Sequence, residues 1–512
     1  MVGRIGFRER VQNAINNQTY PFLKNKNEVK DGEIDQFYSV TKKVLGKSPV
    51  YAISQIGMAQ NPLRKMIWLL ILILGFLASF HEAYRFLKCF LKYPVVVNLH
   101  LEKERNLDFP AVTVCNLNRM KSIYQRCLVP NISLESCLHP GLTMTRTTLF
   151  MSERRGLQSC TTQLGGKIDK ENEANFQFFM KYSSLSEDIR KEIGSRGKEF
   201  IKHCSFNGKL CSENDFLESQ SLRYGNCFTF NQASLNVTKP LTVSETEYWS
   251  GLELNLELNY DDYLPLSSTV GARVNIHDPN VPPSPEEYGI DISSGFETSV
   301  AITQTQEIRL PSPYRDHCVN YSDEGPYRHS QGLCVRYCIQ KINYKTCGCA
   351  DPTLTSTTRL KTCNLTNANE SCCLNEVLDR IFEDKAACDC PLPCVTTFYG
   401  EKVSVAKWPS EASFFKGNLT KSDYLRDVKH LRKSQAKLRV FYSTLIRKIY
   451  RQRKRFLESE IFSHIGGELG LWLGLTLMVI FEIFETSWYL IKYFINLHAN
   501  HNGKLQCNQL YN

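Results

Sequence analysis

Two apolar segments near the ends of the 512-residue chain constrain its fold more than any other feature. The first, residues 66–80, carries no charged side chain and continues as a mixed stretch to residue 91. That length exceeds the roughly 20 residues that a helix needs to cross a bilayer. The second covers residues 461–491 and contains three glutamates. We therefore expect two membrane-spanning helices. We expect no secretory signal peptide, because a long and mostly polar stretch precedes the first segment.

Basic residues beside the two segments predict how the chain crosses the membrane. Arg64 and Lys65 precede the first segment, and Lys492 lies at the end of the second. Because cytosolic flanks carry the excess of lysine and arginine, both termini are expected in the cytosol of a multi-pass plasma-membrane protein. The expected parts are a cytosolic segment 1–65, a transmembrane helix 66–91, an extracellular domain 92–460, a transmembrane helix 461–491 and a cytosolic tail 492–512.

The cysteines favour an extracellular location for the large domain. Of the 20 cysteines, 18 lie between Cys115 and Cys394, and only Cys89 and Cys507 lie outside. In an oxidising compartment such a set predicts disulfides. Zinc binding by the CxC and CxxxC groups is the alternative, but six glycosylation sequons share the region and favour secretion. They are headed by Asn131, Asn236, Asn320, Asn364, Asn369 and Asn418.

Charge and motif content exclude several classes of function. The net charge of +10 comes largely from the cytosolic start and from residues 421–455. An extracellular location makes nucleic acid an improbable partner for these basic residues. The histidines are scattered and no nucleophile motif is present, so we expect neither an enzyme nor a bound metal or cofactor.

The pattern between the two apolar segments predicts an α+β domain with a central β-sheet core and peripheral helices. Strict alternation over residues 252–258 is typical of a half-buried strand. Residues 318–394 are cysteine-dense and are expected to be rich in loops. Two membrane helices cannot enclose a pore alone, so a pore would require several subunits. The other expected elements are strands within 95–115, 227–309 and 436–449 and helices over 186–204 and 421–435.

The last apolar segment contains the stretch FSHIGGELGLWLGLT at residues 462–476, which is unusual for a plain membrane anchor. At 100° per residue, one stripe of a continuous helix would carry Gly467, Leu471, Gly474, Met478, Glu482 and Glu485. Acidic groups in a membrane are costly unless they face water or a partner, and glycine can expose carbonyls to an ion. The stripe is therefore either pore-lining or a small-residue helix contact. Glu468 lies off the stripe, and its role stays open.

Several motifs occur in order along the chain and together resemble the degenerin/epithelial sodium channel family, which includes acid-sensing and peptide-gated channels. They are FPAVTVCNLNRM (109–120), HCSFNGKLC (203–211), YGNCFTFN (224–231), CVRYC, CGC, CDCPLPC, FYGEKVSVAKWPS and IGGELGLWLGLT. The resemblance covers nearly the whole chain. It favours a pore-lining role for the stripe of residues 467–485 over a helix–helix contact. It implies a trimer with a hand-shaped extracellular domain that passes sodium in preference to potassium and is blocked by amiloride.

The resemblance also implies a disulfide scheme. It pairs Cys115 with Cys227, Cys204 with Cys211, Cys318 with Cys394, Cys334 with Cys390, Cys338 with Cys388, Cys349 with Cys363, and Cys347 with Cys372 or Cys373. Cys127, Cys137, Cys160 and one of the adjacent pair are left for two further bridges of unassigned connectivity. The bridges within residues 318–394 would stiffen a strut that carries movement towards the membrane.

Three positions depart from the family pattern. The filter tripeptide, usually Gly/Ser-x-Ser, is Gly474-Leu475-Thr476 here. A His-Gly pair in a cytosolic re-entrant loop is replaced by Tyr51-Ala52, which puts the contribution of that loop to selectivity in doubt. Acid-sensing relatives carry histidines just after the first membrane helix, whereas residues 93–95 contain none. Proton gating therefore loses support.

The resemblance further assigns residues to gating. Ser463 matches the degenerin position, where a small residue permits closure, and His464 lies where acid-sensing relatives have an aspartate. Tyr93 and Tyr314 are expected to stack and couple the extracellular domain to the first membrane helix. The alternative is that each tyrosine is an independent interfacial anchor.

The implied function is an amiloride-sensitive, sodium-selective homotrimer in the lipid bilayer, with hetero-assembly also compatible. Among extracellular ligands we favour a neuropeptide of the FMRFamide type. The alternatives are a proton-, bile-acid- or mechanically gated channel of the same family, or a non-conducting accessory subunit.

Overall fold

The computed structural model describes residues 42, 46, 48, 50–128, 170–233, 239–264, 267–321, 330–354, 360–383, 388–414 and 421–508. The chain divides into two compact units. Residues Met1–Pro94 and Lys454–Asn512 form the first, which we call the helical unit. Residues Val95–Arg453 form the second, which we call the sheet unit.

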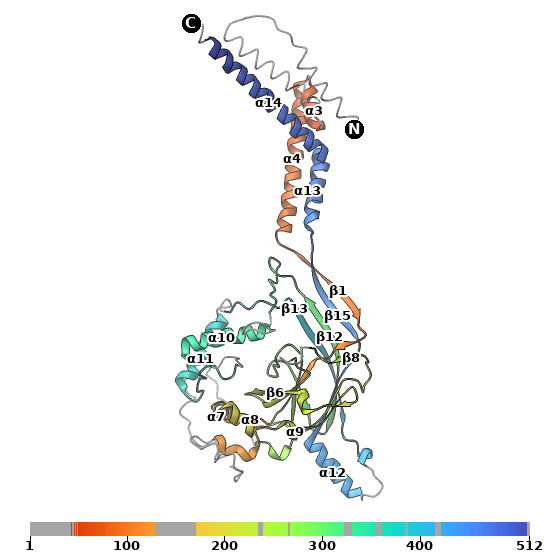
Figure 1. Ribbon diagram of the computed structural model, residues 1–512, viewed down its shortest axis with the longest axis vertical. Helices are drawn as coiled ribbons and strands as arrows, with labels where there is room; N and C mark the ends of the chain where they lie inside the picture. The colour runs from red at the N-terminus through yellow and green to blue at the C-terminus, as the bar shows by residue number, and fades with distance from the viewer. Residues whose placement is uncertain are drawn as a thin grey trace. The chain divides into compact units, whose positions relative to one another are not determined.

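The helical unit contains α3 (Tyr51–Met58), α4 (Pro62–Phe90), α13 (Glu458–Leu473) and α14 (Leu477–Asn508), and α4 and α13 lie side by side (Figure 1). Pro62 begins α4, where a missing backbone N–H removes no helical hydrogen bond. Within the described residues, α4 is the one helix that is long and apolar enough by itself to cross a membrane. The helix α13 passes the same test only when joined to Leu477–Tyr489.

The sheet unit is built on an eight-stranded sheet of order β1-β15-β12-β14-β9-β4-β5, with β13 also paired to β12. Alternate residues of β9 and β14 are buried, as the sequence pattern predicts for strands with one face in a core. The bounds are β1 Val95–Lys103, β4 Ile201–Phe206, β5 Lys209–Leu210, β9 Leu252–Glu257, β12 Phe296–Ile308, β13 Val395–Lys407, β14 Gln435–Tyr442 and β15 Ile446–Lys454.

A second sheet has five strands in the order β11-β10-β3-β7-β6. Every residue of β3 and β7 is buried, so these strands occupy the middle of the unit. Leu254 of β9 and Val300 of β12 share one apolar core with Val114 of β3 and Phe228 of β7. The bounds are β3 Ala111–Asn116, β6 Phe216–Ser221, β7 Gly225–Phe230, β10 Gly271–His277 and β11 Ile290–Ser293, with a separate pair β2 Leu107–Asp108 and β8 Thr242–Val243.

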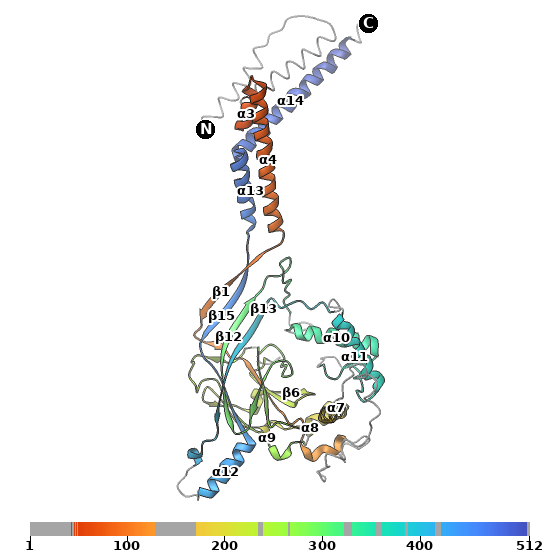
Figure 2. The ribbon, with the colours of Figure 1, turned by 180° about the vertical axis from the view of Figure 1, so that it is seen from behind.

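Helices lie at the periphery of these sheets, and α10 and α11 run side by side on one flank (Figure 2). The α-helices are α7 Lys170–Ser183, α8 Glu187–Ile193, α9 Gly197–Phe200, α10 Gln331–Cys347, α11 Ala368–Glu383 and α12 Lys421–Ser434. Short 3₁₀ helices are η1 Ser122–Leu128, η3 Glu213–Asp215, η4 Tyr260–Asp262 and η5 Glu411–Phe414.

Three predicted elements differ from the structure. Residues 318–394 contain two helices that the sequence pattern did not predict, α10 and α11. The Ser330 hydroxyl caps α10 by accepting a hydrogen bond from the Leu333 N–H at 3.2 Å. The helix expected over 186–204 gives way to β4 at Ile201. The single strand expected over 436–449 is two, since the chain turns after β14, where the Ser443 N–H donates to the Ile302 carbonyl at 3.0 Å.

Seven disulfides link described cysteines, and they are the pairs that the resemblance implies. They are Cys115–Cys227, Cys204–Cys211, Cys318–Cys394, Cys334–Cys390, Cys338–Cys388, Cys347–Cys373 and Cys349–Cys363. Cys127 and Cys372 are disulfide-bonded as well, whereas Cys137 and Cys160 lie outside the described residues. Cys89 on α4 is a free, exposed thiol.

A buried polar chain crosses the middle of the five-stranded sheet. The His277 Nδ1–H donates to the Asp278 carbonyl at 3.0 Å, which leaves Nε2 to accept from the Thr113 hydroxyl at 2.9 Å. Thr113 in turn accepts from Thr229 at 2.8 Å. Burial lowers the pKa of His277 below its ordinary value of 6.5. The imidazole is therefore held neutral in one tautomer.

Candidate ion pathway

The predicted filter tripeptide is the break between α13 and α14. Gly474 has a positive φ of 64°, and its N–H donates to the Gly470 carbonyl at 3.0 Å. The Leu475 N–H donates to the Leu469 carbonyl at 3.3 Å. These two bonds close the end of a helix in the way that a glycine at the first non-helical position allows. The axes of the two helices then differ by 71°.

Thr476 is the residue directly before the second of these helices. Its hydroxyl accepts a hydrogen bond from the Val479 N–H at 3.3 Å, and its carbonyl accepts from the Ile480 N–H at 3.1 Å. A helix start leaves N–H groups without partners, and serine and threonine are good caps for them. The serine that is usual in the family and the threonine of this chain both supply such a hydroxyl. The replacement of the usual serine by Thr476 therefore keeps the hydroxyl that caps the helix.

The break corrects the stripe calculated from the sequence. That calculation assumed one continuous helix from Gly467 to Glu485, and it is wrong beyond Gly474 because α14 takes a different direction. Within α13, an exposed face still carries Ser463, Gly467 and Leu471, and Leu471 is 78% accessible. A Cβ atom built on Gly467 would meet nothing within 4 Å. This face of α13 is therefore not covered by the described part of the chain.

The side chains predicted on α14 are exposed as well. Met478 is 68% accessible, and Glu482 and Glu485 also lie at the surface of this helix. Their predicted role as a ring of carboxylates depends on neighbouring subunits, so it stays a prediction.

A neighbouring side of α13 packs on α4, and His464 takes part in this contact. The His464 ring stacks on Phe86, with 4.0 Å between ring centroids, and Nδ1 lies 3.9 Å from a carboxylate oxygen of Glu468. Glu468 also accepts a hydrogen bond from the Trp472 indole at 3.1 Å. His464 thus contributes to the contact between the two helices, although 41% of its side chain stays accessible. Glu468, whose role the sequence left open, has partners on its own helix.

Gly75 allows α13 to approach α4 closely. A Cβ atom at Gly75 would lie 3.1 Å from the Trp472 carbonyl oxygen and 3.3 Å from the Leu473 Cδ2 atom. Small residues permit such close contact between membrane helices. Sequence analysis missed this residue. The sequence feature that could have indicated it is a single glycine within a run of large apolar residues.

Tyr51 and Ala52, predicted in a re-entrant loop, lie in the first turn of α3. The Tyr51 ring contacts Trp68 of α4 edge-on, with centroids 5.4 Å apart. The Arg64 guanidinium donates to the Gln55 side chain at 3.1 Å. A short helix bound to α4 therefore occupies this position, and its contribution to selectivity stays a prediction.

Tyr93 follows α4 with a φ of 47°, and its ring lies 6.2 Å from that of Phe90. Tyr314 belongs to the sheet unit, where its N–H donates to the Pro311 carbonyl at 3.2 Å. Their predicted stacking would join the helical unit to the sheet unit, and it stays a prediction.

Three of the six predicted glycosylation sites are placed. Asn320, Asn364 and Asn369 are exposed on the sheet unit, as acceptors of a glycan must be. Asn131, Asn236 and Asn418 lie outside the described residues.

Comparison with known proteins gives a family match over most of the chain. The family model of the amiloride-sensitive sodium channel matches residues 45–486. Degenerin mec-10 of Caenorhabditis elegans is 32% identical over 327 residues, which cover 62% of this chain and 44% of the relative. Degenerin-like protein asic-1 of the same organism is 29% identical and is likewise covered over 44% of its length. The chain thus spans less than half of these two relatives.

Acid-sensing ion channel 1 of Gallus gallus matches over nearly its full length. It is 25% identical over 482 residues, which cover 91% of this chain and 87% of the relative. A solved structure of a proton-activated chloride channel has a TM-score of 0.30 at 6% identity, covering 83% of this chain and 96% of that one. A score this low carries no argument about the fold or the transported ion.

Proposed function

The chain belongs to the amiloride-sensitive sodium channel family, and we propose that it forms a sodium-selective cation channel opened by an extracellular ligand. Members of this family are ion channels of the plasma membrane and not enzymes. The helix break at Gly474-Leu475-Thr476 is the observation that carries the proposal, because it interrupts the helical hydrogen-bond ladder within an apolar pair of helices. Backbone carbonyls exposed at such a break can replace the hydration shell of a passing cation.

The proposed channel is a homotrimer in which each subunit crosses the bilayer twice. Residues 66–91 and 461–491 span the membrane, residues 92–460 lie outside the cell, and 1–65 and 492–512 lie in the cytosol. One apolar helix and one bent pair cannot surround a pore, so several copies are required. The exposed face of α13 supplies a surface for those copies or for the pore between them.

The residues of the proposed pore fall into three groups. Gly474, Leu475 and Thr476 form the filter, and the pore above it is lined by Gly467 and Leu471. Met478, Glu482 and Glu485 line the inner pore, where three copies of each carboxylate attract cations and exclude anions. Amiloride is the expected blocker, as in the family.

Gating is proposed to start in the extracellular domain and to reach α13. The five disulfides within residues 318–394 reduce the freedom of a region that must transmit movement. Tyr314 and Tyr93 would pass the movement to α4, and Ser463 would permit the helices to close. If the two tyrosines act together, the effects of Tyr93→Ala and Tyr314→Ala on the half-maximal ligand concentration will not add.

We favour an amidated neuropeptide of the FMRFamide type as the ligand, because residues 93–95 lack the histidines of acid-sensing relatives. A second candidate is proton gating, which the long alignment with acid-sensing ion channel 1 favours. Cells that express only this chain can be tested with the amidated peptide Phe-Met-Arg-Phe and with external acid. A sodium current evoked by the peptide supports the first candidate, and a current evoked by acid alone replaces it with the second.

A further inference from the structure

A cavity of about 360 Å³ lies against the five-stranded sheet of the sheet unit. Four parts of the chain line it: the segment after β3, helix α7, the β6–β7 turn, and the segment before β10. Its volume falls within the range of sites for small organic ligands. Neither the predicted filter nor the predicted gate contributes to it.

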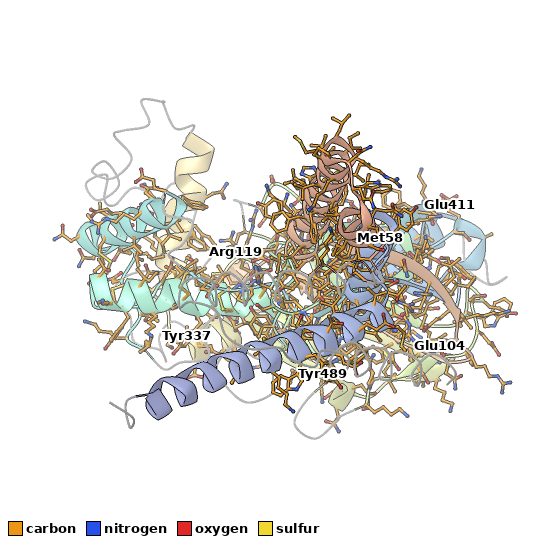
Figure 3. All side chains as sticks on the ribbon, turned by 90° about the horizontal axis from the view of Figure 1, so that it is seen from above. Met58, Glu104, Arg119, Tyr337, Glu411 and Tyr489 are labelled. Carbon is orange, nitrogen blue, oxygen red and sulfur yellow. A yellow bond between two sulfur atoms is a disulfide. The ribbon has the colours of Figure 1, made fainter. Side chains whose placement is uncertain are left out.

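Two arginines line the cavity without an acidic partner. Arg119, which is labelled in Figure 3, and Arg223 form no ion pair with a described residue, and no aspartate or glutamate is among the described lining residues. The Arg119 Nε–H donates to the Arg223 carbonyl, but its buried Nη1 has no hydrogen-bond partner. A buried cationic donor left in this state is costly. Burial, together with the neighbouring Arg223, lowers the pKa of Arg119.

The backbone holds the two arginines next to each other. Gly225, directly after the β6–β7 turn, has a φ of 76°, and a Cβ atom there would lie 2.5 Å from the Arg119 carbonyl oxygen. The Cys115–Cys227 disulfide joins the two strands from which these residues emerge. The Arg119 guanidinium also lies over the Phe178 ring, 5.5 Å from its centroid. The cationic end of the cavity is thus built before any ligand arrives.

The remaining walls are apolar or carry hydroxyl groups, apart from the Asn175 amide. Leu117, Phe178 and Leu264 supply apolar surface, and residues 267–269 supply two serines and a threonine. Tyr224 is a further wall, and the guanidinium groups of Arg223 and Arg273 each lie 5.8 Å from its ring centroid. A bare inorganic anion would use the arginines and leave the apolar walls without a partner.

We propose that this cavity binds an organic carboxylate, with its carboxylate at Arg119 and Arg223 and its apolar part against Phe178 and Leu117. Guanidinium groups recognise carboxylates through paired, charge-assisted hydrogen bonds. An amidated peptide carries positive charge and no terminal carboxylate, so such a peptide would have to bind elsewhere. The proposal concerns binding alone and does not depend on whether the chain conducts sodium.

The test uses purified full-length protein in detergent and 3-phenylpropionate as the probe, titrated by saturation-transfer NMR. Its neutral counterpart 3-phenylpropanamide differs only in the charged group. We expect the acid to bind and the amide to bind at least about tenfold more weakly. Arg119→Gln or Arg223→Gln should each lower the affinity for the acid by at least about tenfold, equivalent to about 1.4 kcal/mol. Arg119→Lys should recover part of the affinity because it keeps the charge.

Arg196→Gln is the matched control, because this exposed arginine of the same unit pairs with Glu192 away from the cavity. It should leave the affinity unchanged. If Arg119→Gln does not fold, the exposed Arg223→Gln carries the test. Equal binding of acid and amide, an unchanged affinity in Arg223→Gln, or full displacement of the acid by equimolar chloride at constant ionic strength would each overturn the proposal.

Discussion

Thr476→Val tests whether the hydroxyl of the predicted filter is a helix cap. Valine has nearly the same shape as threonine but cannot accept the hydrogen bond from the Val479 N–H, which is 3.3 Å long. Loss of a cap of this kind costs about 1 kcal/mol of helix stability. If the Val479 N–H exchanges with solvent through local opening of the helix, a loss of about 1 kcal/mol corresponds to about fivefold faster exchange.

The assay is hydrogen–deuterium exchange, read on peptides that contain residues 477–480 of the full-length protein. Thr476→Val should accelerate exchange there by about fivefold, while peptides from α4 should be unchanged. Thr476→Ser and Thr476→Asn should both remain near the original rate, because serine and asparagine also cap helices. An ion-coordinating hydroxyl with no structural role would instead give equal exchange in the valine and serine variants, which would refute the capping assignment.

Three further predictions follow from other parts of the molecule. Gly75→Leu would overpack the contact with Trp472 and Leu473 by about 1–3 kcal/mol and should lower surface expression or current, whereas Leu74→Phe on the exposed face of α4 should not. Burial lowers the pKa of His277, so the unfolded state binds a proton at this imidazole more readily than the folded state, and the stability of the fold should fall as the pH drops below about 6.5. His277→Gln should flatten this pH dependence in thermal unfolding of the purified protein. An unchanged slope of stability against pH in the variant would contradict the prediction. Ser463→Cys followed by a bulky thiol reagent should raise open probability, and no change in resting current would indicate that the exposed face of α13 does not meet other subunits at the gate.

Much of the sheet unit followed from local patterns in the sequence. Alternation at 252–258 predicted β9, and the charged, periodic stretch at 421–435 predicted α12. The helix α10 was missed because its cysteines were interpreted only as disulfide partners. Cys334 and Cys338 are four residues apart, so they lie on one face of a helix and reach Cys390 and Cys388 together.

The residues assigned to the candidate pathway stay predictions, whereas the bend between its two helices was not predicted. Gly474 was assigned to a continuous stripe, although a glycine followed two residues later by threonine is also the signature of one helix ending and another beginning. Ser463 and His464 lie about 100° apart on α13, and which of them contacts α4 could not be known without the position of α4. Gly75 likewise gains its meaning from Trp472, nearly 400 residues away in the sequence.

The central claim is that this chain forms a sodium-selective pore through the break at Gly474–Thr476 and the carboxylates below it. The most direct measurement is the reversal potential under bi-ionic sodium and potassium, recorded with and without amiloride from cells that express this chain alone, and repeated for Glu482→Gln/Glu485→Gln. Our account predicts an amiloride-blocked current that prefers sodium and loses conductance or selectivity in the double variant. A surface-expressed chain without current under any ligand, or identical conductance and reversal potentials in both proteins, would contradict it.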